Sequence, residues 1–149
     1  MLTALPYLFG GIAMLVMGRL GDRTGNRRMV FAGCMTLTAI GFLGAGIFDH
    51  NTIALTIALI VLGVGLLTTI PAFWTLPPKV VTGVGAAGGI ALINSIGQLG
   101  GIVSPVMVGR ISDLTGSTTP ALYTIVALSL VCVAIAIWVF PKELRAKDV

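Results

Sequence analysis

Five long segments without charged side chains constrain the fold of this 149-residue chain more than any other feature. They cover about residues 2–18, 29–48, 52–76, 80–108 and 119–140. Each meets or approaches the roughly 18–20 apolar residues that a helix needs to cross a bilayer. A soluble bundle is excluded, because five helices that are apolar all round would leave almost no polar surface for water. The sequence therefore predicts one all-α integral membrane domain, residues 1–149, with five transmembrane helices.

Composition agrees with this class. Hydrophobic residues make up 56% of the chain and charged residues only 9%, against about a quarter in ordinary soluble domains. The net charge of +4 does not indicate nucleic-acid binding, because the basic residues sit in short gaps between apolar runs and form no charged face. They are typical of loops that face the lipid headgroups of a bilayer.

The basic residues also predict the orientation of the chain in the membrane. Eight of the nine belong to one set of alternating loops, and only Arg110 belongs to the other. The larger set comprises Arg19, Arg23, Arg27, Arg28, Lys79, Lys142, Arg145 and Lys147. Because Lys and Arg accumulate on cytoplasmic loops, we expect the N-terminus outside and the C-terminus in the cytoplasm. An outer N-terminus so close to the first span suggests a missing upstream segment.

The gap after the first span holds the most specific motif in the chain. Residues 18–28 read G-R-L-G-D-R-T-G-N-R-R, which fits the pattern G-x-x-x-D-R-x-G-x-R-R. Gly18 would let the end of the first helix pack closely on a neighbour, and Gly25 can adopt the positive φ of a tight reversal. Asp22 can cap an adjacent helix or pair with an arginine, as a latch that breaks when domains move.

The other members of the motif are Arg23, Arg27 and Arg28, and the last two would hold the loop at an anionic leaflet. The simpler alternative is a turn that carries positive-inside charge and nothing more, although that rule predicts neither the aspartate nor the glycine spacing. The pattern resembles the short cytoplasmic loop motif of the major facilitator superfamily, the twelve-helix secondary transporters. The resemblance implies a gating role for Gly18, Asp22, Arg23, Gly25, Arg27 and Arg28.

Part of the same motif recurs later in the chain. Residues 109–116 read G-R-I-S-D-L-T-G and match the first copy in glycine, arginine, aspartate, threonine and glycine. Three predicted helices separate the copies, so they fall on opposite sides of the membrane, as in an inverted repeat of three-helix units. The repeat favours a transporter, and the simpler alternative is coincidence in a chain with 20 glycines.

The third and fourth segments contain the polar features of the membrane interior. The prolines between residues 71 and 78 predict a broken helix, because proline lacks a backbone donor and frees carbonyl groups. In the fourth segment Asn94, Gln98, Gly97 and Gly101 share an arc of about 100° on one helical face. This face forms either a polar recess or interhelical glue, and from the residues alone glue is favoured.

Residues 73–97 resemble the tenth and eleventh helices of the anion:cation symporter branch of that superfamily, which includes carriers of sugar acids, tartrate and phthalate. The opening Leu5-Pro6-Tyr7-Leu8 is similar to its eighth helix. The resemblance implies that Trp74 and Asn94 face a substrate cavity. Gln98 stands where the family varies, and Tyr7 either faces the cavity or anchors the helix at the interface.

The resemblance covers only helices eight to twelve of the family fold. It implies proton-coupled transport of a small organic anion by a parent protein in a bacterial inner membrane, with the N-terminal half as a missing partner. The charges that such chemistry needs at the midplane are absent from these five spans and are expected in that half.

The alternative function is a non-transporting five-helix protein that binds a partner membrane protein. An enzyme is not expected, because the spans hold no acid, base or nucleophile set. No cofactor or metal is expected either, since His50 has no second histidine and Cys34 and Cys132 lie far apart.

Overall fold

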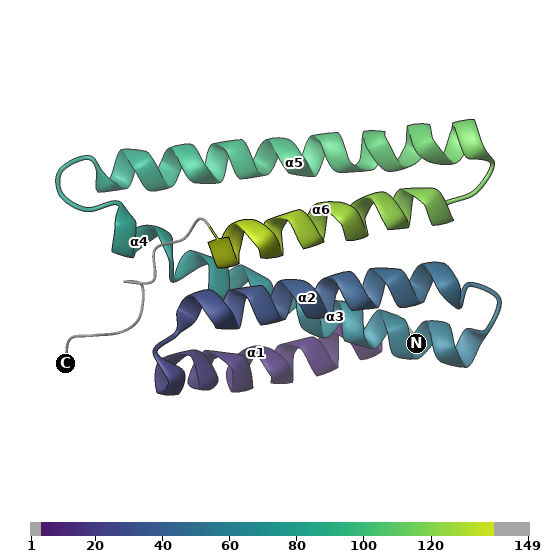
Figure 1. The fold of residues 1–149 in the computed structure, drawn as a ribbon, viewed down its shortest axis with the longest axis horizontal. Helices are drawn as coiled ribbons and strands as arrows, with labels where there is room; N and C mark the ends of the chain where they lie inside the picture. The colour runs from purple at the N-terminus through teal and green to yellow at the C-terminus, as the bar shows by residue number, and fades with distance from the viewer. Residues whose placement is uncertain (1–3, 139–149) are drawn as a thin grey trace.

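The computed structural model describes residues 4–138, apart from the side chains of Lys79 and Val80. Within these residues the helices are α1 (Ala4–Thr24), α2 (Arg27–Ile47), α3 (Thr52–Trp74), α4 (Pro77–Val80), α5 (Ala86–Thr115) and α6 (Thr119–Trp138). All except α4 are long and apolar enough to cross a membrane. The predicted all-α membrane fold with five long helices is confirmed (Figure 1).

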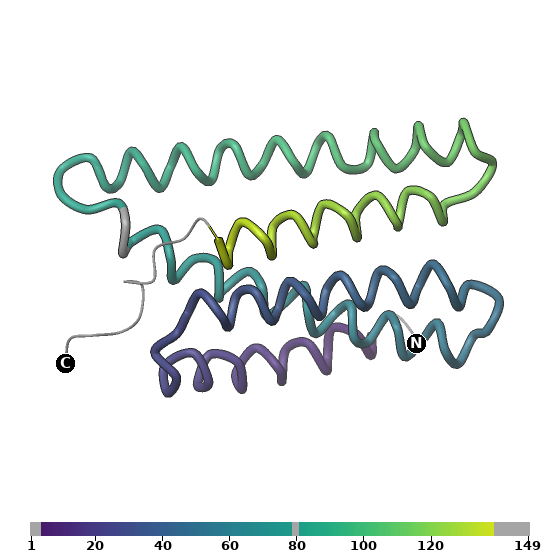
Figure 2. Tube along the Cα trace, in the orientation of Figure 1, coloured from purple at the N-terminus to yellow at the C-terminus, as the bar shows by residue number. Residues whose placement is uncertain are grey.

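Consecutive long helices run in opposite directions, so their connections alternate between two ends of the bundle (Figure 1, Figure 2). One end holds the turn at residues 25–26 and the short helix α4, and the other holds the turns at residues 48–51 and 116–118. The gaps that contain most of the predicted cytoplasmic charge therefore share one end. Lys142, Arg145 and Lys147, which complete that set, lie outside the described residues.

Helix α2 is the centre of the packing, with α3 on one side and α6 on the other, and α3 also covers α1. Glycines bring the backbones together: a Cβ added to Gly41 would lie 2.5 Å from the Leu62 Cα, and one added to Gly65 would lie 2.5 Å from the Thr38 nitrogen. At Gly10 it would lie 2.9 Å from the Gly63 carbonyl oxygen. Transmembrane helices associate through such close contacts, because lipid leaves little hydrophobic driving force between them.

Helix α5 is packed differently from the others. None of its residues is buried, and its main neighbour is α6, which separates it from α2 (Figure 1). It also starts later than the predicted span, at Ala86, because Gly83 takes a positive φ of 79° in the preceding turn. Most of the α5 surface is therefore free of protein contacts within residues 4–138.

Candidate functional site

The glycine and aspartate motif lies almost entirely in helix, which corrects the prediction of a loop over residues 18–28. Helix α1 continues through Gly18, Asp22 and Arg23 to Thr24, and only residues 25 and 26 lie between the helices. The Thr24 hydroxyl donates to the Leu20 carbonyl at 2.8 Å, so its hydrogen bond is made within the helix. The first charged residues therefore mark the end of the apolar part of α1, and the helix itself continues to Thr24.

The reversal itself depends on two residues. Gly25 has a φ of 61°, as predicted, and its N–H donates to the Gly21 carbonyl at 3.1 Å. This left-handed glycine ends α1, because residues with a Cβ avoid that conformation. Asn26 then caps α2, where its side-chain oxygen accepts from the Met29 N–H at 3.4 Å.

An ion pair closes the turn. The Arg27 guanidinium donates to the Asp22 carboxylate at 3.2 Å, linking the last turn of α1 to the first residue of α2. The expected pairing of Asp22 with an arginine is confirmed. The Asp22 side chain is 73% exposed and that of Arg27 is 31% exposed, so water screens the pair and its contribution to stability is about 0–1 kcal/mol. A contact this weak can form and break repeatedly.

A cavity of about 190 Å³ lies beside the ion pair, between α1, α2 and α3. Gly18 opens onto this cavity, and a Cβ added there would meet nothing within 4 Å. The expectation that Gly18 packs closely on another helix is therefore wrong within residues 4–138. Thr68 and Pro71 of α3 and the following Thr75 form the opposite wall, and the sequence interpretation had singled out only Pro71, for the helix break. Their signal was the polar threonines in an otherwise apolar span.

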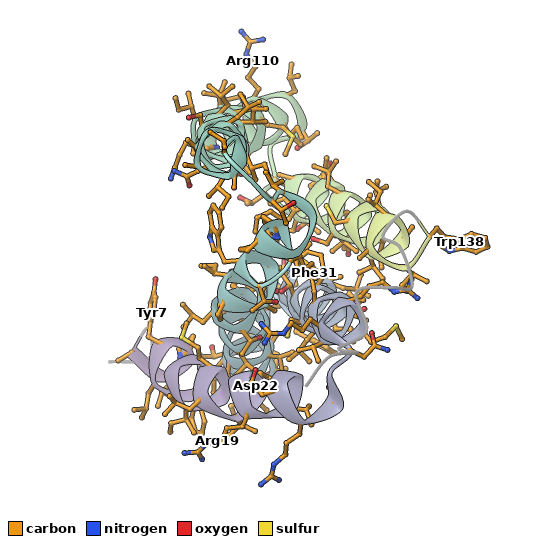
Figure 3. The ribbon with its side chains drawn as sticks, turned by 90° about the vertical axis from the view of Figure 1, so that its left-hand side faces the viewer. Tyr7, Arg19, Asp22, Phe31, Arg110 and Trp138 are labelled. Carbon is orange, nitrogen blue, oxygen red and sulfur yellow. The ribbon has the colours of Figure 1, made fainter. Side chains whose placement is uncertain are left out.

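The remaining basic residues surround the same turn. Arg23 lies in the last turn of α1, and Arg28 follows Arg27 in the first turn of α2. Arg19 points away from the bundle, whereas Asp22 lies on the side of α1 that faces the other helices (Figure 3). This end of the bundle thus combines the Asp22–Arg27 ion pair with the exposed charges of Arg19 and Arg23.

The predicted helix break falls later than Pro71. Helix α3 passes through Pro71 and ends at Trp74, and Pro77 starts α4. A proline in the first turn of a helix costs no backbone hydrogen bond, so the break settles between Trp74 and Pro77. The Trp74 ring packs edge-on against Phe73, with centroids 5.5 Å apart, and 36% of the residue is exposed.

No hydrogen bond joins the four candidate cavity residues, Tyr7, Trp74, Asn94 and Gln98, within residues 4–138. The amides of Asn94 and Gln98 are exposed on α5 and have no hydrogen-bond partner within residues 4–138. A Cβ added to Gly97 would meet nothing within 4 Å, so this face packs on no described helix. Interhelical glue between the described helices is therefore not their role. Tyr7 is 71% exposed and rises from α1 on the side where α5 lies (Figure 3).

Comparison with known proteins points to one family. A family model described as Major Facilitator Superfamily matches residues 1–148. A protein of Agrobacterium vitis named "Putative tartrate transporter" is 40% identical over 131 residues, which cover 87% of this chain and 29% of that protein.

Two further relatives come from other bacteria. The "Quinolone resistance transporter" of Acinetobacter baumannii is 35% identical over 146 residues, or 98% of this chain and 33% of that protein. The "Inner membrane transport protein RhmT" of Escherichia coli is 29% identical over 87% of this chain and 30% of that protein. This chain thus spans about a third of the length of the relatives it matches. No solved structure matches it.

Proposed function

Because this chain belongs to the major facilitator superfamily, we propose that it forms part of a secondary transporter that moves a small organic anion across a membrane by alternating access. The observation that carries the proposal is the similarity of residues 1–148 to this family, and the exposed Asp22–Arg27 ion pair in the turn after α1 supports it. The same family membership favours transport over the alternative of a five-helix protein that only binds a partner.

An organic acid is the substrate class that we favour. Two relatives from Agrobacterium vitis, 40% and 38% identical, carry names that refer to tartrate. In this proposal Trp74 and Asn94 line the cavity together with Gln98 and Tyr7. Their side chains are neutral, so the counter-charge and the proton-coupling carboxyl belong to the N-terminal half of the transporter. The membrane is a bacterial inner membrane, with the Gly25 turn on the cytoplasmic side.

The Asp22–Arg27 pair acts as the latch of the proposed gate. It lies at the end of the bundle where α1 and α2 meet, beside a cavity into which a neighbouring element could move. Gly18, Arg23, Gly25 and Arg28 complete this gating segment. A weak, exposed pair suits a latch, because a transition between two states must not be blocked by a strong contact.

The function is tested with a chimera. The matching segment of the Agrobacterium vitis relative is replaced by this chain, and uptake of labelled tartrate is measured in cells alongside the unmodified relative. We expect uptake at the same order of rate. A chimera that reaches the membrane but does not take up tartrate contradicts the proposed substrate class, and quinolone efflux by that chimera would assign a different one.

We expect Asp22→Asn in this chimera to slow uptake by up to about fivefold, since removing an exposed ion pair changes a two-state balance by about 1 kcal/mol or less. Membrane insertion should be unchanged, as immunoblots of the membrane fraction would show. The matched control is Asp113→Asn in the second copy of the motif, because Asp113 has no ion-pair partner within residues 4–138. Equal uptake by both variants and the unsubstituted chimera would rule out a latch at Asp22.

A further inference from the structure

The register of the repeated motif can be continued along the two helices that carry it. When the chain is shifted by 91 residues, two identities lie upstream of the motif, Leu8 with Leu99 and Gly10 with Gly101, and the residues between Gly10 and Gly18 differ. The shift therefore aligns the whole second half of α1 with the second half of α5. The motif sets this register, and the structure of the two copies tests whether it holds along the helices.

The two copies also have the same local structure. Thr115 donates to the Ile111 carbonyl at 2.7 Å, as Thr24 does to Leu20 at 2.8 Å. Gly116 ends α5 with a φ of 69°, as Gly25 ends α1 with a φ of 61°. Each copy of the motif therefore ends a helix in the same way. A threonine hydroxyl donates to the carbonyl four residues earlier, and a glycine with positive φ follows it.

The equivalence continues into the following helices. The shift pairs Thr38 of α2 with Ser129 of α6, and both are buried. Thr38 donates to the Cys34 carbonyl at 3.0 Å and Ser129 to the Ile125 carbonyl at 2.9 Å, which are themselves paired by the shift. Other threonines of these helices make the same bond, so it is the burial of both hydroxyls at the same register that supports the repeat.

The arrangement in space is that of a twofold axis. Helices α1 and α5 run in opposite directions, α2 and α6 do the same, and α2 packs on α6 (Figure 1). An axis that passes between α2 and α6, perpendicular to the helices, therefore exchanges the two halves approximately. In a membrane this axis lies in the plane of the bilayer.

This register pairs Tyr7 with Gln98. Each precedes the equivalent glycine, Gly10 or Gly101, by three positions and lies about 60° from it around the helix. Gly10 faces α3, so Tyr7 lies on the flank of the packed face, where it is 71% exposed and points to the side on which α5 lies (Figure 3). The twofold relation gives Gln98 the equivalent direction, from α5 back toward the side on which α1 lies.

We propose that Tyr7 and Gln98 face each other across the transport cavity and bind the oxygens at the two ends of a small hydroxylated acid. The proposal rests on the proposed function. Tyr7 donates a phenolic hydrogen, while the amide of Gln98 can donate to a carboxylate or accept from a hydroxyl. Both are neutral, so they select for the position of polar oxygens without supplying the counter-charge.

The pair is tested in the chimera by removal and by exchange. We expect Tyr7→Phe and Gln98→Leu each to raise the half-saturating tartrate concentration by about tenfold or more, the effect of one lost hydrogen bond to a charged carboxylate. Tyr123→Phe on α6 is the matched control and should leave it unchanged. An unsubstituted chimera without uptake would contradict the proposed function, whereas normal uptake with no effect of Tyr7→Phe overturns only the pair.

The exchange variant distinguishes facing residues from independent ones. Tyr7→Gln and Gln98→Tyr, made singly, leave two like groups and should each raise the half-saturating concentration. Made together, they restore one phenol and one amide across the cavity, so the double variant should recover to within about threefold of the unsubstituted chimera. If the increases in half-saturating concentration of the two single variants multiply in the double variant, the proposal is overturned.

Discussion

Replacing Gly65 by valine is expected to prevent α3 from docking on α2, and most of the protein should be lost from the membrane fraction. A Cβ at this position would lie 2.5 Å from the Thr38 nitrogen and 2.8 Å from its Cα. Those atoms are backbone inside a helix, so they cannot rotate aside as a long side chain would. Overpacking usually costs 1–3 kcal/mol, and here we expect about 3 kcal/mol or more.

The measurement is the amount of folded protein recovered in mild detergent, followed by its thermal unfolding. Gly33→Val is the matched control, because it places the same β-branched side chain in the same helix pair, on α2, where a Cβ meets nothing within 4 Å. Recovery of Gly65→Val at the level of Gly33→Val would contradict the close packing of α2 and α3 described above.

The fold was predictable because the bilayer imposes it on the sequence. Lipid cannot satisfy backbone polar groups, so an apolar run of sufficient length has to be a helix whatever it packs against. The helix ends were less predictable. At Thr24 and Thr115 the hydroxyl bonds its own helix, which lets α1 and α5 continue past the last apolar residue.

Which glycines bring helices together could not be predicted. The face of Gly97 and Gly101 was the one expected to pack on another helix, yet both glycines are open in the structure, and the close contacts fall at Gly41 and Gly65. Each of these faces has a glycine with a small residue four positions later: Gly101 after Gly97, Ala45 after Gly41 and Thr69 after Gly65. The difference lies in whether another helix is present opposite the pattern, and spacing within one helix contains no information about that.

In the candidate site, too, contacts between residues close in sequence were predictable, and contacts with distant segments were not. The pairing of Asp22 with an arginine and the positive φ of Gly25 follow from contacts between residues close in sequence, so the motif predicted them. The surroundings of Trp74 and Asn94 depend on contacts with distant segments. Within residues 4–138 no hydrogen bond joins these two side chains, and their place in a cavity stays a prediction.

Replacing Asn94 by alanine in the chimera is expected to raise the half-saturating tartrate concentration by about 10–150-fold. A hydrogen bond between a neutral amide and a charged substrate contributes roughly 1.5–3 kcal/mol, which corresponds to that range. The Asn94 amide has no partner within residues 4–138, and α5 contains no buried residue, so its loss should leave the packing of the described helices unchanged. Uptake kinetics and the thermal unfolding temperature are measured together.

The neighbouring Ser95→Ala is the matched control, because it removes a polar group from the same turn of α5 about 100° around the helix. We expect Ser95→Ala to keep the kinetics of the unsubstituted chimera. Binding and packing predict opposite results for Asn94→Ala: weaker substrate binding at an unchanged unfolding temperature places the amide in the cavity. A lower unfolding temperature with unchanged kinetics would instead mean that Asn94 bonds to a helix of the other half, because an amide that loses a protein partner destabilises the fold and leaves substrate affinity as it was.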